Sequence, residues 1–202
     1  MVRKVAKPAR RHAKQPRAQQ TIAVVLDAAA QVLQRRGYAG ATTNRIAERA
    51  GVSVGTIYQY FADKDQIFDQ LIQREIEGLI GLLRRVAFDP GAPIADGLRR
   101  MLRLLVEARP DAPVLYRALE HVPEGLFRRR VAAARGRVIA LTREFLAAHR
   151  SEIHVSDLDI ASFVLVTAAE GVAMSSSAEF YRERCTDELT LAFTRYLTGR
   201  GT

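Results

Sequence analysis

The chain has 202 residues and a formal net charge of +9, with 48% hydrophobic and 26% charged side chains. This length and composition indicate a folded protein with a substantial core and exclude a largely disordered chain. The single cysteine, Cys185, excludes an internal disulfide and a zinc site of four cysteines. The longest apolar run, residues 160–169, is about half as long as the roughly 20 residues of a membrane-spanning helix. We therefore expect a cytoplasmic protein with no membrane partner.

The positive charge is concentrated at the N-terminus. Residues 1–20 contain seven basic and no acidic side chains, whereas the rest of the chain contains 24 basic and 22 acidic ones. We expect residues 1–20 to form a flexible basic tail, because Pro8 and Pro16 disfavour a continuous helix. Such a tail indicates a polyanionic partner, most simply nucleic acid, although a solvated leader with no partner is the alternative.

After the tail, apolar side chains recur every three or four residues, which is the period of helices that bury one face. Three short helices are predicted first. Gly37 is expected to end the first, Thr42 or Thr43 to cap the second, Gly51 to end the second, and Ser53 to cap the third.

Longer helices are predicted in the remainder of the chain. Asp63 and Gln66 have the spacing of a capping box at the start of a fourth, long helix. Ser156 and Asp159 are expected to form a similar box for the eighth helix, and Thr186 to cap the ninth. No alternating strand pattern is present. The sequence therefore predicts an all-α fold of about nine helices.

The second and third helices carry the information about function. The turn at Gly51 allows a positive φ, so the third helix can cross the second steeply, as in a helix-turn-helix that enters the major groove of DNA. Hydroxyl groups and free helix starts suit phosphates, an amide suits base edges, and a glycine allows close approach of the backbone. The expected DNA contacts are Thr43, Ser53, Val54, Gly55, Thr56, Tyr58, Gln59, Tyr60 and Lys64.

This stretch resembles the tetracycline-repressor (TetR) family of bacterial regulators, and the similarity extends from the first predicted helix to about Leu71. Tyr60 stands where many members have histidine, but it keeps an aromatic body and a polar tip. Asn44 falls at a variable position of the family and is a further expected DNA contact. The resemblance rests on Thr42-Thr43, Ile46-Ala47, Ala50-Gly51-Val52-Ser53, Gly55-Thr56-Ile57-Tyr58, Tyr60-Phe61 and Lys64.

The resemblance implies a DNA-binding domain at residues 21–65 and a helical effector-binding and dimerisation domain at residues 66–202. It implies a homodimer, paired through the last two helices, that binds a palindromic operator as a repressor. A small molecule would then move the fourth helix and release the DNA. We expect a hydrophobic or aromatic effector, because the predicted pocket is apolar. An activator of the same fold and a ligand-independent DNA-binding protein are the alternatives.

The effector pocket is expected on the interior faces of the fifth to eighth helices. Glu170, next to an apolar run, would have to pair or protonate if buried. It is expected to contact the effector, to form an ion pair between subunits, or to lie partly exposed beside the dimer interface. The other expected pocket residues are Met101, Leu105, Tyr116, Leu141, Phe145, Phe163 and Thr167.

Neither an enzyme nor a metal protein is indicated. The G-x-S-x-G pattern at residues 51–55 lacks the preceding strand of a hydrolase, and the four histidines lack the spacing of metal ligands. We therefore expect no catalytic residue and no cofactor.

Overall fold

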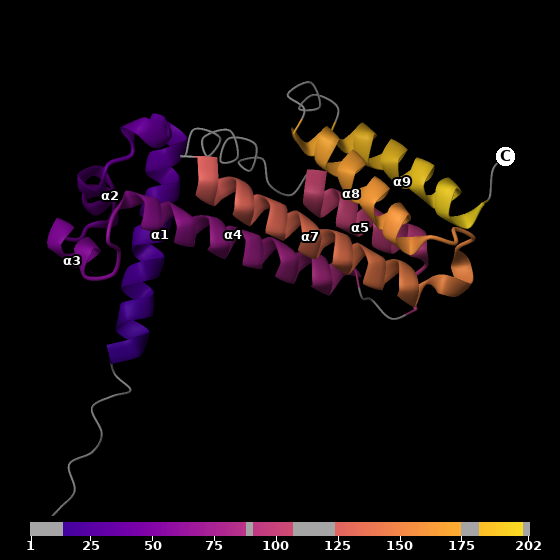
Figure 1. Ribbon diagram of the computed structural model, residues 1–202, viewed down its shortest axis with the longest axis horizontal. Helices are drawn as coiled ribbons and strands as arrows, with labels where there is room; N and C mark the ends of the chain where they lie inside the picture. Colours follow the sequence, from indigo (N-terminus) through magenta and orange to yellow (C-terminus); the bar gives the residue numbers. More distant parts are fainter. Residues whose placement is uncertain (1–13, 88–90, 107–123, 175–181, 200–202) are drawn as a thin grey trace, which may run out of the picture. The chain divides into compact units, whose positions relative to one another are not determined.

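The computed structural model describes residues 14–87, 91–106, 124–174 and 182–199, and its regular elements there are all helical (Figure 1). The all-α class is therefore confirmed. These ranges contain eight α-helices and one short 3-10 helix. The predicted sixth helix, with Leu115 and Leu119, lies outside the described residues. None of the described helices has the length and apolar character that crossing a bilayer requires.

The chain divides into two compact units, Met1–Leu71 and Ile72–Thr202, so the division falls inside the fourth helix. The helices are α1 Lys14–Gly40, α2 Thr43–Ala50, α3 Val54–Tyr58, α4 Lys64–Ala87, α5 Ile94–Val106, α7 Glu124–Ala148, the 3-10 helix η1 Arg150–Glu152, α8 Leu158–Met174 and α9 Arg182–Thr198.

The first unit contains α1, α2, α3 and the start of α4. In it α1 packs on α2, and α2 packs on α3. Apolar side chains at helical spacing meet in its core, where fewer than a tenth of their surfaces remain exposed. The largest of them are Leu33, Ile46, Ile57, Phe61, Ile67, Phe68 and Leu71.

Helix α1 begins at Lys14, so the prediction that residues 14–20 belong to a flexible tail is wrong. Pro16 lies in the first turn, where a missing N–H costs no intrahelical hydrogen bond and the fixed φ suits the helix. The expected stop at Gly37 is a kink, with φ 65° and ψ 176°, after which the chain continues to Gly40. Residues 1–13 lie outside the described ranges.

The start of α4 has the predicted capping box. The Asp63 carboxylate accepts a hydrogen bond from the backbone N–H of Gln66 at 2.8 Å. The side-chain oxygen of Gln66 in turn accepts one from the backbone N–H of Ala62 at 2.6 Å. The first bond satisfies a backbone donor that the start of the helix leaves unpaired, and the second reaches the residue before the cap rather than the cap itself.

The second unit is built around one apolar core. Helices α7 and α8 pack together, and α5 packs on both α8 and α9. The core draws on α4, α5, α7, α8 and α9, and it includes Leu83, Leu98, Met101, Leu102, Leu141, Phe145, Leu146, Leu165, Phe193 and Leu197.

Two predicted caps in this unit are wrong. Asp157, not Ser156, caps α8, because its carboxylate accepts from the backbone N–H groups two and three residues later at 3.0 and 2.9 Å. Helix α9 begins at Arg182, and Thr186 lies buried within it. The carbonyl of Thr186 accepts a hydrogen bond from the hydroxyl of Thr190 at 2.7 Å, so Thr186 occupies an ordinary position inside the helix.

Candidate nucleic-acid interface

The turn between α2 and α3 has the backbone conformation that the sequence predicts. Gly51 adopts φ 67° and ψ 29°, in the left-handed region, at the C-terminal cap of α2. That region costs an L-residue roughly 1–2 kcal/mol, and glycine does not incur this cost. The backbone N–H of Val52 then donates to the carbonyl of Ala47 at 3.1 Å, which closes the end of α2.

Serine and threonine side chains form the starts of the two helices. The hydroxyl of Thr42 accepts from the backbone N–H of Arg45 at 3.3 Å, so Thr42 rather than Thr43 is the cap of α2. Ser53 is the predicted cap of α3 and accepts from the backbone N–H of Thr56 at 3.0 Å. The hydroxyl groups of Ser53 and Thr56 are 2.8 Å apart. Ser53 therefore orders the helix that DNA binding would use.

Helix α3 and the residues that follow it, up to Phe61, have the predicted division between an inner and an outer face. Ile57 and Phe61 are buried, while Tyr58 is 56% exposed and Gln59 is exposed. The remaining predicted contacts on this segment are exposed or partly exposed, and they are Ser53, Val54, Gly55, Thr56 and Tyr60. A Cβ atom added at Gly55 would contact only the Ser53 hydroxyl, at 3.7 Å, so this face is open to a close approach.

The start of α2 lies beside the end of α3. The hydroxyl oxygens of Thr43 and Tyr58 are 3.5 Å apart. Asn44 follows Thr43 and is exposed. The structure thus brings predicted contacts from two helices together on one polar surface.

Lys64 has a role that the sequence did not predict. Its ammonium group donates to the backbone carbonyl of Tyr38 at 3.2 Å and lies 4.0 Å from the centre of the Tyr38 ring. Tyr38 also donates its hydroxyl hydrogen bond to Asp65. Lys64 and Asp65 therefore fasten the end of α1 to the start of α4. The motif contains Gly37-Tyr38, but the partners of Tyr38 become visible only in the fold.

The environment of Tyr38 strongly favours its neutral form. Burial of the ring raises the pKa of its hydroxyl far above the ordinary value of 10.0. The hydrogen bond to Asp65 and the negative charges of Asp65 and Asp63 raise this pKa further. The hydroxyl therefore remains a donor at any physiological pH.

Some of the residues expected to line an effector pocket lie in or against the core of the second unit. Met101, Leu141 and Phe145 lie in the packed core of the second unit, and Leu105 is partly buried against that core. Tyr116 lies outside the described residues.

Phe163 and Thr167 do not have the interior positions that were expected. Phe163 is 47% exposed and Thr167 is exposed, because α8 turns its opposite face to the core. Arg135 of α7 lies over them: its guanidinium is 4.9 Å from the centre of the Phe163 ring and donates to the Thr167 hydroxyl at 2.6 Å. It also donates to Glu170 at 2.8 Å. Glu170 therefore has its ion-pair partner within its own chain.

Both helices at the end of the chain expose large apolar side chains. Ile160, Phe163 and Val164 of α8 are about half exposed, as are Leu191 and Tyr196 of α9. Among the described residues, no group of three or more His, Cys, Asp or Glu side chains is arranged to hold a metal ion.

Two family models match this chain. The model of bacterial regulatory proteins of the tetR family matches residues 25–71, and the model of the tetracyclin repressor-like C-terminal domain matches residues 93–197. The chain belongs to the TetR family. The first match covers the helix-turn-helix described above, and the second covers most of the second unit.

The relatives with known names are regulators. The chain is 36% identical over 102 residues to the HTH-type transcriptional regulator HbdR of Aromatoleum sp., a match that covers 45% of this chain and 41% of that protein. It is 33% identical over 95 residues to the HTH-type transcriptional repressor KstR of Mycolicibacterium smegmatis, covering 47% and 46%. The HTH-type transcriptional activator FasR of that organism is 36% identical over 84 residues, covering 42% and 36%. These matches span less than half of each relative.

Solved structures of transcriptional regulators share the fold over nearly the whole chain. A transcriptional regulator from Rhodococcus sp. Rha1 is 21% identical, with a TM-score of 0.72 over 88% of this chain and 96% of that one. A TetR-like transcriptional regulator from Rhodococcus sp. RHA1 is 29% identical, with a TM-score of 0.64 over 88% and 94%. The TetR fold therefore extends through both units.

Proposed function

We propose that this protein is a DNA-binding transcriptional repressor that leaves its operator when a small apolar molecule binds. One observation carries the proposal: a TetR-family helix-turn-helix in which α3 and the residues after it bury Ile57 and Phe61 and turn Tyr58 and Gln59 to solvent. Hydroxyl and amide groups on such a surface suit phosphates and base edges. We also propose that the protein is cytoplasmic and has no catalytic activity, which DNA binding of this kind supports.

Repression is proposed ahead of activation. KstR is named as a repressor and FasR as an activator, so the family includes both. A repressor needs only to occupy its operator, whereas an activator must also contact the transcription machinery. The position of the operator relative to the promoter distinguishes the two.

A homodimer through α8 and α9 is part of the proposal. The apolar side chains that these helices expose support it, because large exposed apolar groups on a helix pair favour association. A two-fold dimer would present two copies of α3 to half-sites one helical turn, about 34 Å, apart. The operator is therefore expected to be palindromic.

The proposed effector binds in the second unit. The core there is apolar, so a hydrophobic or aromatic compound suits it better than a sugar. One relative, 38% identical over 52 residues, is named a fatty acid metabolism regulator protein in Bacillus subtilis, which fits an apolar effector. Entry beside Met101, Leu105 and Leu141 would disturb the packing of the core.

Helix α4 is the proposed link between effector and DNA. It runs continuously through the division of the chain after Leu71, so both units contain part of it. In the second unit, ion pairs between exposed side chains join α4 to α7: Arg137 donates to Glu77 at 2.6 and 2.9 Å. Exposed pairs of this kind contribute little to stability, so they would not prevent a shift of α4.

The test begins with selection of an operator from random duplex DNA. Gln59→Ala and Tyr58→Ala should each weaken binding to that operator by roughly ten- to a hundred-fold, since removing a base or phosphate contact costs about 1–3 kcal/mol. Gln73→Ala is the matched control, because Gln73 is an exposed glutamine on α4. Binding is measured by fluorescence anisotropy, and circular dichroism checks the fold.

Two outcomes would contradict the proposal. A selection that returns no preferred sequence would favour a ligand-independent, non-specific DNA-binding protein. Unchanged affinity of both α3 variants would show that this helix does not read the DNA.

A further inference from the structure

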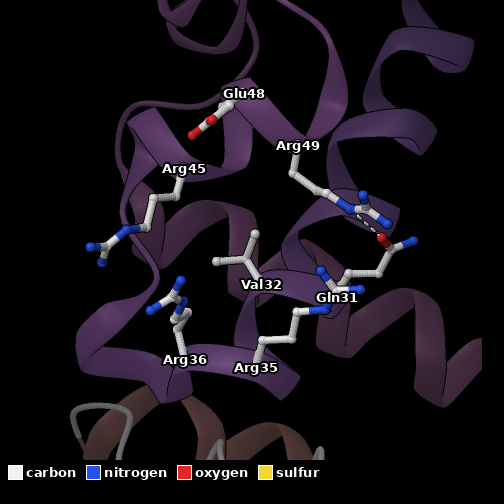
Figure 2. Close-up of a pocket in the computed structure, with 7 residues that line it drawn as sticks. All are labelled: Gln31, Val32, Arg35, Arg36, Arg45, Glu48 and Arg49. Carbon is white, nitrogen blue, oxygen red and sulfur yellow. Dashed lines mark hydrogen bonds between the residues drawn. The ribbon is translucent and has the colours of Figure 1, made fainter.

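A pocket of about 400 Å³ lies between α1 and α2 in the first unit (Figure 2). Four arginines line it: Arg35 and Arg36 come from α1, and Arg45 and Arg49 come from α2. Residues 21–65 contain five basic side chains, and the fifth is Lys64. This stretch has four acidic side chains, so its charge is almost balanced, yet four of its five cations lie at one place. We refer to this site as the arginine pocket.

The guanidinium groups lie on two sides of the pocket. Figure 2 shows Arg36 with Arg45 on one side of Val32, and Arg35 with Arg49 on the other. Val32 is buried beneath them, so the floor of the pocket is apolar. All four arginines are exposed.

Little within the described chain balances these charges. Arg45 donates to the backbone carbonyl of Gly40 at 2.6 Å, and Arg49 donates to the side-chain oxygen of Gln31. Both partners are neutral. Arg35 and Arg36 make no hydrogen bond or ion pair with any described residue, although Glu48 also lines the pocket. The pocket therefore has a net positive charge and unused N–H donors.

Several guanidinium groups around one hollow repel each other unless an anion lies between them. Their planar sets of N–H donors match the oxygens of a phosphate and bind it in pairs. An ammonium group offers no such match. We infer that the arginine pocket binds phosphate groups of the DNA backbone, beside the groove that α3 enters. This inference rests on the proposed function.

The position of the pocket favours duplex DNA as the source of the phosphate. Arg45 directly follows Thr43 and Asn44, which are predicted DNA contacts on α2. In helix-turn-helix proteins the helix before the recognition helix crosses the DNA backbone. Duplex DNA presents phosphates in a row, so both sides of the pocket can be filled at once. A single inorganic phosphate ion would occupy only one side of the pocket.

The test uses the full-length double variant Arg35→Gln/Arg36→Gln. Its affinity for the selected operator and for a scrambled duplex is measured against salt concentration. The slope of log affinity against log salt should fall in magnitude by about 0.9 for each phosphate that the variant no longer neutralises. Both duplexes should weaken by the same factor, because phosphate contacts hold no sequence information. The preference for the operator should remain.

The control removes the same charge elsewhere. Arg129→Gln/Arg184→Gln replaces two exposed arginines of the second unit, and its salt slope should equal that of the wild type. A further variant, Arg35→Lys/Arg36→Lys, keeps the charge but removes the paired donors. It should retain most of the slope and bind both duplexes more weakly than the wild type does. It also provides the test if the glutamine variant fails to fold.

The possible failures are distinguishable. If the wild type shows no operator preference, the proposed function fails. If the wild type does prefer its operator, but the pocket and control variants have the same slope, the inference about the pocket fails. The last experiment is a calorimetric titration of the wild type and the Arg35→Gln/Arg36→Gln variant with inorganic phosphate. Phosphate binding that needs Arg35 and Arg36, together with an unchanged DNA slope, would assign the pocket to free phosphate and overturn its role on DNA.

Discussion

At the scale of single residues, Tyr38 shows how one side chain connects two helices. Its ring packs against Phe68 of α4, with the ring centres 5.4 Å apart, while its hydroxyl donates to Asp65. The ammonium group of Lys64 donates a hydrogen bond to the backbone carbonyl of Tyr38 and lies over the face of its ring. Each of these contacts joins the end of α1 to the start of α4, so Tyr38 determines how the first unit closes around its core.

Tyr38→Phe should lower the free energy of unfolding by about 1–3 kcal/mol, because Asp65 is left without its donor in a partly buried place. The pKa of Tyr38 is raised in the folded state, so its stabilising effect is complete below its ordinary pKa of 10.0. The effect declines as the pH rises above that value. The gap in stability between wild type and variant should therefore narrow above pH 10, as measured by urea unfolding. Tyr58→Phe, at an exposed position, is the control. A difference in stability between wild type and Tyr38→Phe that stays constant up to pH 12 would contradict the stabilising role of the Tyr38 hydroxyl.

Lys64 is an ambiguous site for mutation for the same reason. Replacing it by alanine would remove an expected phosphate contact and would also release Tyr38. A loss of DNA binding in that variant could not be attributed to the DNA surface alone, which is why Tyr58 and Gln59 are the better targets.

At the scale of helices, α5 approaches α7 through Gly97. A Cβ atom built there would lie 2.6 Å from the Phe145 ring, which is completely buried. Phe145 also packs against His149, with the ring centres 4.4 Å apart, so the ring has little room to move. Contact between α5 and α7 therefore depends on the absence of a side chain at this position.

Gly97→Ala should destabilise the protein by about 1–3 kcal/mol, the usual cost of overpacking a core. Gly136→Ala is a matched control, since Gly136 is exposed on α7 and has open space around it. Alanine is the better helix former, so the control should gain about 0.5–1 kcal/mol. Thermal unfolding of the two variants should give shifts of opposite sign, and equal shifts would refute the packing argument.

The helices and caps that were predicted correctly depend on local chemistry. Gly51 and Ser53 have roles that follow from the backbone freedom of glycine and from the hydroxyl of serine, and neither needs tertiary contacts. The effector residues were harder to predict. Residues 160–169 are almost uniformly apolar, so their pattern could not show that Phe163 faces away from the core. The arginine pocket forms only when α1 packs on α2, and sequence spacing does not reveal that contact.

At the scale of the whole molecule, positive charge that could serve DNA binding occurs in two separate parts of the chain. One is the arginine pocket. The other is the N-terminal segment 1–13, which holds five basic and no acidic side chains. Both would release counterions on binding, but by different contacts, and their effects on the salt slope should add.

Deletion of residues 2–13 should reduce the salt slope of DNA binding while leaving α1 intact, because the helix begins at Lys14. The reduction should appear in the pocket variant as well as in the wild type. Affinity measured across a series of salt concentrations checks this. If the truncated protein keeps the full slope, the segment does not touch the DNA.

The apolar side chains that α8 and α9 expose have a consequence for how the protein behaves on dilution. In the proposed homodimer, Ile160, Val164 and Leu191 are covered only while two chains remain together. Association would then stabilise the fold by mass action, so the melting temperature would rise with protein concentration. At low protein concentration, operator DNA would also stabilise the fold, because an operator that binds two chains side by side favours the dimer.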